Sequence, residues 1–146
     1  MTESRILEIS ARETYPLRSL VLRNADVSKP CPFEGDSEKT THHFGCRIGD
    51  EIVSIVSFFA IKNENFGDKT MVQLRGMATH PDYAKKGFGT DLIEFSLVFF
   101  QTKVQLIWCN AREIAIPFYE KLGFIPTGEK FEIPNLGIHI LMYYEF

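Results

Sequence analysis

The chain has 146 residues, of which 45% are hydrophobic, and its formal net charge at pH 7 is −3. This length predicts one domain, residues 1–146, with enough apolar side chains for a sizeable core. The slightly negative charge argues against a broad surface for nucleic acid or for an anionic membrane, and no apolar run is long enough to span a bilayer. We therefore expect a soluble protein that acts on a small molecule or on a peptide end.

The three cysteines, Cys31, Cys46 and Cys109, are odd in number and widely spaced. They match neither a paired metal motif nor a disulfide framework, which favours a reducing, cytoplasmic setting. Charged residues interrupt the first 23 positions, so this segment does not resemble a signal peptide.

The first third of the chain predicts a strand, a helix and a long loop. Residues 5–10 alternate between polar and apolar side chains, as in a strand, and residues 11–23 carry an apolar helical stripe. We expect Pro16 in the first turn of that helix, where its missing N–H costs little. Residues 24–41 are rich in Pro, Gly and polar side chains, which indicates a loop of a length that is often functional.

The middle of the chain predicts three strands. Residues 44–48 and 52–61 flank the turn Gly49-Asp50 and form a hairpin signal. The second of these strands is apolar on both faces, which is typical of a central strand covered on both sides. After a turn at residues 63–69, residues 71–78 form the next strand.

The second half predicts a crossover and a final hairpin. Residues 89–101 form a buried helix between the strands 71–78 and 104–109, and this order implies a parallel pair. Residues 113–122 form another helix, which ends at Gly123 in a left-handed conformation. Residues 124–133 and 137–144 form two antiparallel strands. The sequence therefore predicts an α/β protein with one mixed sheet and helices on both faces.

A phosphate-binding turn is indicated where residues 77–90 lead from a strand into a helix. Gly87 and Gly89 open that helix, whose first amides lack partners within the helix, and Lys85 and Lys86 add positive charge. This layout predicts a pocket for a pyrophosphate. The alternative is a tight strand-to-helix turn with solvated lysines. The segment is neither a Walker A loop nor a complete dinucleotide fingerprint.

Two motifs together resemble the GNAT family of acetyl-CoA-dependent N-acetyltransferases. The family's phosphate motif, Gln/Arg-x-x-Gly-x-Gly/Ala, corresponds here to Ala84-Lys-Lys-Gly87-Phe-Gly89, and the second motif is Asn110 followed by residues 118–124, Phe-Tyr-Glu-Lys-Leu-Gly-Phe. Ala84 departs from the pattern. Since backbone amides are the main phosphate ligands, we expect some loss of loop rigidity without loss of cofactor binding.

The resemblance implies a GNAT-like acyl-CoA N-acyltransferase fold, a mixed, mostly antiparallel sheet with one splayed parallel pair. Pantetheine of acetyl-CoA would enter the gap between strands 71–78 and 104–109. The N–H of Ala78, or of its neighbour, would point at the thioester carbonyl, and Tyr119 would be the general acid that protonates the leaving thiolate. The implied contacts of the cofactor are Met77, Ala78, Thr79, Lys85, Lys86, Gly87, Phe88, Gly89, Thr90, Asn110, Ala115 and Phe118.

The residue that takes the proton of the attacking amine stays open at this point. The candidates are Glu34, Asp36, His43 and His80, with His43 and Glu34 ranked first. Each also has an ordinary structural interpretation, because loop acids are usually solvated and His80 precedes a proline. Tyr119, taken alone, is more typical of a helix aromatic that packs on a sheet, and only its place in the motif favours the general acid.

Other polar residues have weaker signals. Arg75 and Gln73 lie in an apolar strand, where an arginine usually pairs with a carboxylate; the functional alternative for Arg75 is a grip on a substrate carboxylate. Trp108 and Cys109 are typical of core residues. His42-His43 does not form a metal site, since adjacent strand residues point to opposite faces and no third ligand follows at metal spacing.

The predicted activity is transfer of an acetyl group to a primary amine of a small molecule or peptide. Two alternatives remain: an acyl group or acceptor of another kind, such as a protein N-terminus or lysine, and an acyl-CoA-binding sensor without turnover. A structural domain with no cofactor is a third class. A homodimer through an exposed strand edge is also compatible with the sequence.

Overall fold

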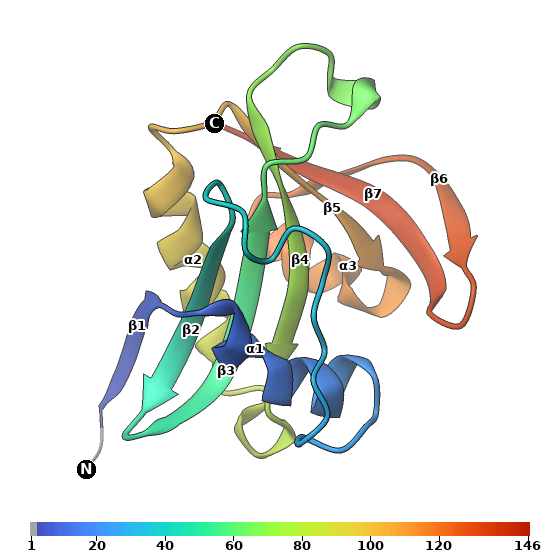
Figure 1. Cartoon of the computed structure of the whole chain (residues 1–146). Coiled ribbons are helices and arrows are strands. Elements are labelled where there is room, and N and C mark those ends of the chain that lie inside the picture. Colours follow the sequence, from blue (N-terminus) through green and yellow to red (C-terminus); the bar gives the residue numbers. More distant parts are fainter. Residues whose placement is uncertain (1–2) are drawn as a thin grey trace.

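The computed structural model describes residues 3–146, which form a seven-stranded sheet in the order β1-β2-β3-β4-β5-β7-β6 (Figure 1). Strands β4 and β5 are parallel, and the other neighbours are antiparallel, so the predicted mixed sheet is confirmed. The strands are β1 (Ser4–Glu8), β2 (His42–Ile48), β3 (Glu51–Phe59), β4 (Met71–Thr79), β5 (Leu106–Arg112), β6 (Ile125–Ile133) and β7 (Gly137–Glu145).

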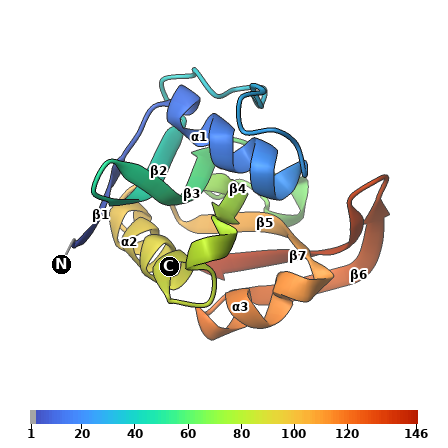
Figure 2. The same ribbon diagram turned by 90° about the horizontal axis from the view of Figure 1, so that it is seen from below.

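Helices cover both faces of this sheet, as predicted (Figure 2). On one face lies α1 (Ala11–Leu17), which continues as the π-helical turn η1 (Arg18–Leu22). On the other face lie α2 (Phe88–Phe100) and α3 (Ile116–Lys121). Three short 3₁₀ turns complete the elements: η2 (Glu64–Phe66), η3 (Pro81–Tyr83) and η4 (Glu113–Ala115).

The first helix corrects one prediction. Ser10 caps α1 by accepting the N–H of Glu13 at 3.2 Å, and Glu13 in turn accepts the N–H of Ser10 at 2.9 Å. Because α1 begins at Ala11, Pro16 lies inside the helix and not in its first turn. A proline there cannot donate to the carbonyl four residues earlier, and the α-helix gives way to the wider π turn just after it.

Two hydrophobic clusters hold the helices against the two faces of the sheet. The larger cluster lies under α2 and α3, where Leu92 and Ile93 of α2 pack on Val56, Leu74 and Ile107 of the central strands. A smaller cluster lies under α1 and includes Leu17, Ile55 and Ala78. Strand β3 is buried along most of its length, so the prediction of a central strand for residues 52–61 is confirmed, with bounds 51–59.

Residues 24–41 form the expected long connection without a strand or an α-helix, but a buried ion pair holds it against the sheet. Arg18 is fully buried and donates to both carboxylate oxygens of Asp36, at 2.8 and 2.9 Å, and to Ser57 Oγ at 3.0 Å. His43 Nε2 donates to the carbonyl of Asp36 at 3.0 Å, and His43 Nδ1 accepts from Ser57 at 2.7 Å. Paired partners of this kind make the burial of charge tolerable.

Two predicted boundaries shift in the second half. Strand β5 runs to Arg112, so it extends three residues beyond the predicted end at Cys109 and includes Asn110. The helix predicted for residues 113–122 begins as η4 and becomes α-helical only at Ile116. Gly123, with φ of 98°, follows this helix in the left-handed conformation, as predicted.

Candidate active site

Strands β4 and β5 separate within a few residues of where they first meet. Their register covers Met71↔Leu106, Val72↔Ile107 and Gln73↔Trp108, after which β4 continues to Thr79 and β5 to Arg112 without further pairing. Beyond that point β5 follows β7 instead, as far as Arg112↔His139. The splayed parallel pair implied by the sequence resemblance is therefore present.

A bulge in β4 sits at the edge of this gap. The register of β4 with β3 shifts between Ser57↔Arg75 and Ile55↔Ala78, so Gly76 and Met77 both lie opposite Val56. Gly76 has φ of 65°, and a Cβ there would lie 3.0 Å from the Phe33 ring. Glycine thus permits both the backbone bend and the close packing of Phe33 on the strand.

The bulge determines which amides face the gap. His80 donates its N–H to the carbonyl of Val53 at 2.8 Å, and Ala78 is in register with Ile55. Because hydrogen-bonded pairs alternate along an antiparallel ladder, the amide of Ala78 is directed at β3. The amides of its neighbours Met77 and Thr79 are directed at the gap. Of the two sequence alternatives for an oxyanion donor, this geometry favours a neighbour of Ala78.

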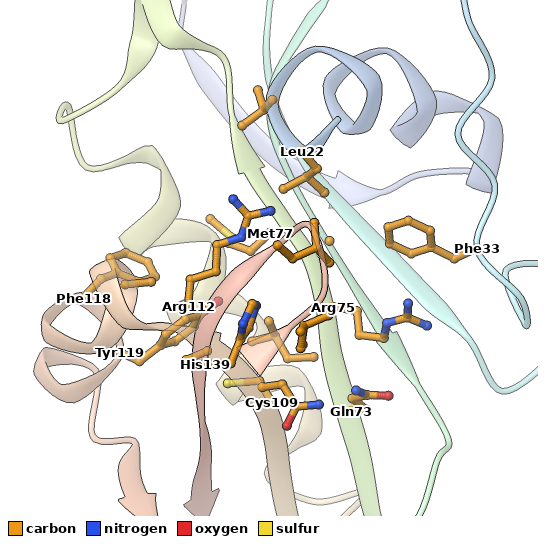
Figure 3. A pocket seen from close by; sticks show the side chains of 18 of the residues that line it. Leu22, Phe33, Gln73, Arg75, Met77, Cys109, Arg112, Phe118, Tyr119 and His139 are labelled. Carbon is orange, nitrogen blue, oxygen red and sulfur yellow. The ribbon is translucent and has the colours of Figure 1, made fainter. Parts of the chain in front are cut away.

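A cavity of about 520 Å³ occupies the gap and is lined by residues from both faces of the sheet (Figure 3). On the side of α1 it is lined by Leu22 of η1 and by Phe33 of the long loop, and on the opposite side by Phe118 and Tyr119 of α3. A molecule bound here would therefore contact residues of both faces.

The N-terminus of α2 has the features of an anion site. Gly87, the cap residue, has φ of 89°, and Lys85 has φ of 61°. Among residues 3–146 no hydrogen bond is accepted from the amides of residues 85–90, and the first helical bond of α2 begins at Asp91. A Cβ at Gly89 would lie 2.9 Å from Met77 Cε and 3.6 Å from Phe118 Cζ, so glycine keeps this corner open beside the gap. These residues fit a pyrophosphate joined to a chain that enters the cavity.

Tyr119 lies on the α2 and α3 side of the cavity. Its side chain is 6% exposed, and burial, together with the nearby Cys109, raises the pKa of its phenol well above the usual value. The phenol therefore stays protonated across the physiological range and can only act as an acid. Burial also raises the pKa of Cys109 to about 12, so this thiol is a small core residue.

Sequence analysis missed His139, which lies on β7 and points into the cavity (Figure 3). Its Nδ1 donates to the carbonyl of Gly137 at 2.8 Å, so the neutral ring has an unprotonated Nε2. Nε2 has no partner among the described residues, and it is not among the fully enclosed unpaired atoms, which are Arg18 Nε and Arg47 Nε. An available lone pair in a cavity is what a general base needs. The sequence signal that could have identified it was a single histidine within the mostly apolar segment 137–144.

The four candidates for a base named from the sequence do not line the cavity. Both ring nitrogens of His43 are paired in the network around Asp36, whose carboxylate is bound by Arg18. Glu34 is exposed on the long loop. His80 accepts the N–H of Asp82 at 3.1 Å and so shapes the turn after β4, as its ordinary interpretation predicted.

The remaining predicted residues divide between cavity and core. Asn110, Ala115 and Phe118 line the cavity, as do Arg75 and Gln73. Trp108 packs with Met71 and Leu106, and its Nε1 donates to the carbonyl of Ile61 at 2.9 Å, which makes it a core residue. In the described part of the chain no cluster of three or more His, Cys, Asp or Glu could hold a metal ion.

None of the helices between residues 3 and 146 is both long and apolar enough to cross a membrane.

Comparison with known proteins agrees with this geometry. The model of the Acetyltransferase (GNAT) family matches residues 5–124. The chain is 35% identical over 138 residues to YitI, an N-acetyltransferase of Bacillus subtilis (strain 168) described as uncharacterized, covering 92% of this chain and 91% of the relative.

Solved structures share the fold at lower identity. Escherichia coli ElaA superposes with a TM-score of 0.73 at 22% identity, over 99% of this chain and 100% of that one. An aminoglycoside 6′-N-acetyltransferase in complex with coenzyme A superposes with a TM-score of 0.70 at 14% identity, over 97% and 96%. The family model spans most of the chain, and the splayed strands and the open helix terminus agree with it. This protein therefore belongs to the GNAT acetyltransferase family.

Proposed function

We propose that this acyltransferase uses acetyl-CoA as cosubstrate and acetylates a primary amine by direct attack in a ternary complex. The observation that carries the proposal is the gap between β4 and β5, which has unpaired amides at the start of α2 on one side and holds a cavity lined from both faces of the sheet. The aminoglycoside enzyme with this fold binds coenzyme A, which supports the same cosubstrate here.

Binding of acetyl-CoA would use backbone groups above all. The amides of residues 85–90 would hold the pyrophosphate, with Lys85 and Lys86 adding charge. The gap-facing backbone of Met77 and Thr79 would pair with the pantetheine amides, and Asn110, Ala115 and Phe118 would flank the arm. The bound thioester supplies an activated acetyl carbonyl next to the bulge in β4.

The chain's own groups then suit the two proton transfers. Nε2 of His139 would accept the proton that the attacking amine must lose, and the hydroxyl of Tyr119 would protonate the sulfur as the C–S bond breaks and the C–N bond forms. The amide of Met77 would donate to the developing oxyanion, an interaction typically worth about 3–4 kcal/mol of barrier. The three free, buried cysteines suit a cytoplasmic setting.

A two-part measurement tests the proposal: calorimetric titration with CoA, and release of free thiol from acetyl-CoA with a panel of primary amines. The enzyme proposal predicts heat in the first and amine-dependent thiol in the second. Binding of CoA with no thiol release for any amine would instead support a sensor, and absence of both would contradict the cosubstrate.

A further inference from the structure

The ionisable side chains that line the cavity include several bases and no carboxylate. Its lining includes three arginines, Arg23, Arg75 and Arg112, together with His139, and it contains no Asp or Glu. Within a cavity, charges of one sign without partners raise the local concentration of a ligand of the opposite sign. An enzyme that received a plain cationic amine in this cavity would gain from acidic groups there, which are missing from its lining.

Arg75 is the best-placed of the three. It extends from β4 two residues before Met77, where the strands have already parted, and its guanidinium carbon lies 4.7 Å from the Phe33 ring centroid and 5.4 Å from that of Phe59. Phe59 shares the α1 face of β3 with Ile55, since Val56 and Phe58 pack under α2 and α3, and Phe33 contacts Arg18 of η1. Both rings therefore lie on the face opposite α2, whose terminus fits the pyrophosphate. Arg75 therefore belongs to the side from which the acceptor amine would approach.

The carboxylate near Arg75, that of Asp36, already has partners within the protein. Asp36 binds Arg18 through both oxygens, and it also accepts the N–H of Phe33 at 2.7 Å. Among residues 3–146 no ion pair joins Arg75 or Arg23 to a carboxylate. Burial and the charges of Arg18 and Arg23 lower the pKa of Arg75, and the opposing charge of Asp36 does not cancel this effect. The ordinary interpretation of a strand arginine, a carboxylate partner within the protein, does not hold here.

We propose that the acceptor is a small amine that also bears a carboxylate, such as an amino acid, and that the guanidinium of Arg75 binds that carboxylate, with Arg23 at the exposed rim. A guanidinium matches a carboxylate with two parallel hydrogen bonds. Only Gly76 separates Arg75 from Met77, whose amide faces the gap. An arginine this close to the proposed site of attack suits an amine and a carboxylate within one small molecule.

This inference rests on the proposed function, and its test compares matched acceptors. Each common amino acid and its carboxamide are assayed by thiol release with acetyl-CoA, using the full chain and the variant Arg75→Met. The amide differs in amine basicity as well as in charge, so the decisive quantity is the acid-to-amide ratio of kcat/KM in the two proteins, from which basicity cancels.

We expect Arg75→Met to lower that ratio about 10- to 100-fold, as loss of a charged hydrogen-bonded pair does, while kcat/KM for the carboxamides changes less than about threefold. Arg75→Lys should recover part of the ratio, since it restores charge without the fork. Arg5→Met, at an exposed position of β1, is the matched control and should leave the ratio unchanged. Melting temperatures and CoA titration show that each variant is folded.

An acid-to-amide ratio that is the same with and without Arg75 would overturn the inference and leave the proposed acetyltransferase intact. A stronger preference for aminoalkylphosphonates than for amino acids would also overturn it, in favour of a phosphate-bearing amine. If no amino acid or carboxamide yields thiol but another primary amine does, the inference fails and the proposed function stands; if no primary amine yields thiol, both fail.

Discussion

Tyr119 and His139 border the same cavity from opposite faces of the sheet, and their polar atoms have different surroundings. Tyr119 packs in the large cluster with Ile140 and Met142, the even-numbered positions of β7, so His139 at an odd position points to the other face. A protonated phenol on one side and a free imidazole nitrogen on the other suit an acid and a base that act on different atoms.

At the residue scale, Tyr119→Phe should separate binding from chemistry. It removes only the hydroxyl, so we expect CoA affinity within about twofold of the parent and thiol release lowered about 10²–10⁴-fold, the usual effect of a positioned proton donor. Calorimetry and the thiol assay measure the two quantities. Tyr143→Phe is the matched control, because Tyr143 packs on Phe66 outside the cavity. Equal activity of both variants would remove Tyr119 from the mechanism.

His139→Gln should remove the group that takes the proton of the attacking amine. We expect the variant to lose about 10²–10⁴-fold in kcat/KM, the usual effect of a positioned proton acceptor, while it still binds CoA. The thiol assay and calorimetry measure the two quantities. Activity equal to that of the parent would show that another group takes the proton.

At the scale of elements, the first turn of α2 contains a glycine, which lowers helix propensity but leaves space for a ligand. Gly89 in the first turn disfavours the helix by about 1 kcal/mol relative to alanine. Its missing Cβ leaves open the corner between Met77, Thr79 and Phe118. The helix terminus thus keeps amides and space that a purely structural turn would not need.

Gly89→Ala should therefore stabilise the fold slightly and weaken cofactor binding. The displaced atom is the flexible end of Met77, so we expect a melting temperature equal to or above that of the parent and a Kd for CoA raised at least about tenfold. Differential scanning fluorimetry and calorimetry give both values. Glu94→Ala, at an exposed position of the same helix, should leave the Kd unchanged. A variant that binds CoA as tightly as the parent would argue against this corner as part of the site.

At the scale of the whole molecule, the network of Arg18, Asp36, Ser57 and His43 joins η1, the long loop, β2 and β3. Burial holds the pKa of His43 below its usual 6.5. Burial alone would raise the pKa of Asp36, but the hydrogen bonds from Arg18 and Phe33 hold it below its usual 3.8. The unfolded chain therefore takes up each proton at a higher pH than the folded one does.

Acid should consequently destabilise the fold in two stages. The free energy of unfolding should decrease as pH falls below about 6.5, from His43, and again below about 3.8, from Asp36. Urea titrations over a pH series measure both. His43→Gln should flatten the first stage, whereas His42→Gln, at the neighbouring partly exposed residue, should retain it. An unchanged slope in His43→Gln would contradict the role of this ring.

The sequence by itself determined the element order, the hairpins, the crossover helix and the amide-rich turn before α2, because these depend on local periodicity, glycine conformation and motif spacing. The resemblance of its motifs to those of the GNAT family implied Tyr119, Asn110 and Phe118 as site residues, and all three line the cavity. Local signals did not place Pro16 correctly. The cap at Ser10 starts α1 at Ala11, so this proline lies inside the helix and not in its first turn.

The tertiary structure alone decided which groups meet. The bulge in β4 directed the amides of Met77 and Thr79, and not that of Ala78, at the gap. The register of β5 with β7 brought His139 into the cavity. Asp36 of the long loop, which His43 of β2 binds, holds Phe33 beside Arg75. Each of these depends on pairing between segments far apart in the chain. A one-residue change of register turns a side chain to the other face, and no local pattern records that choice.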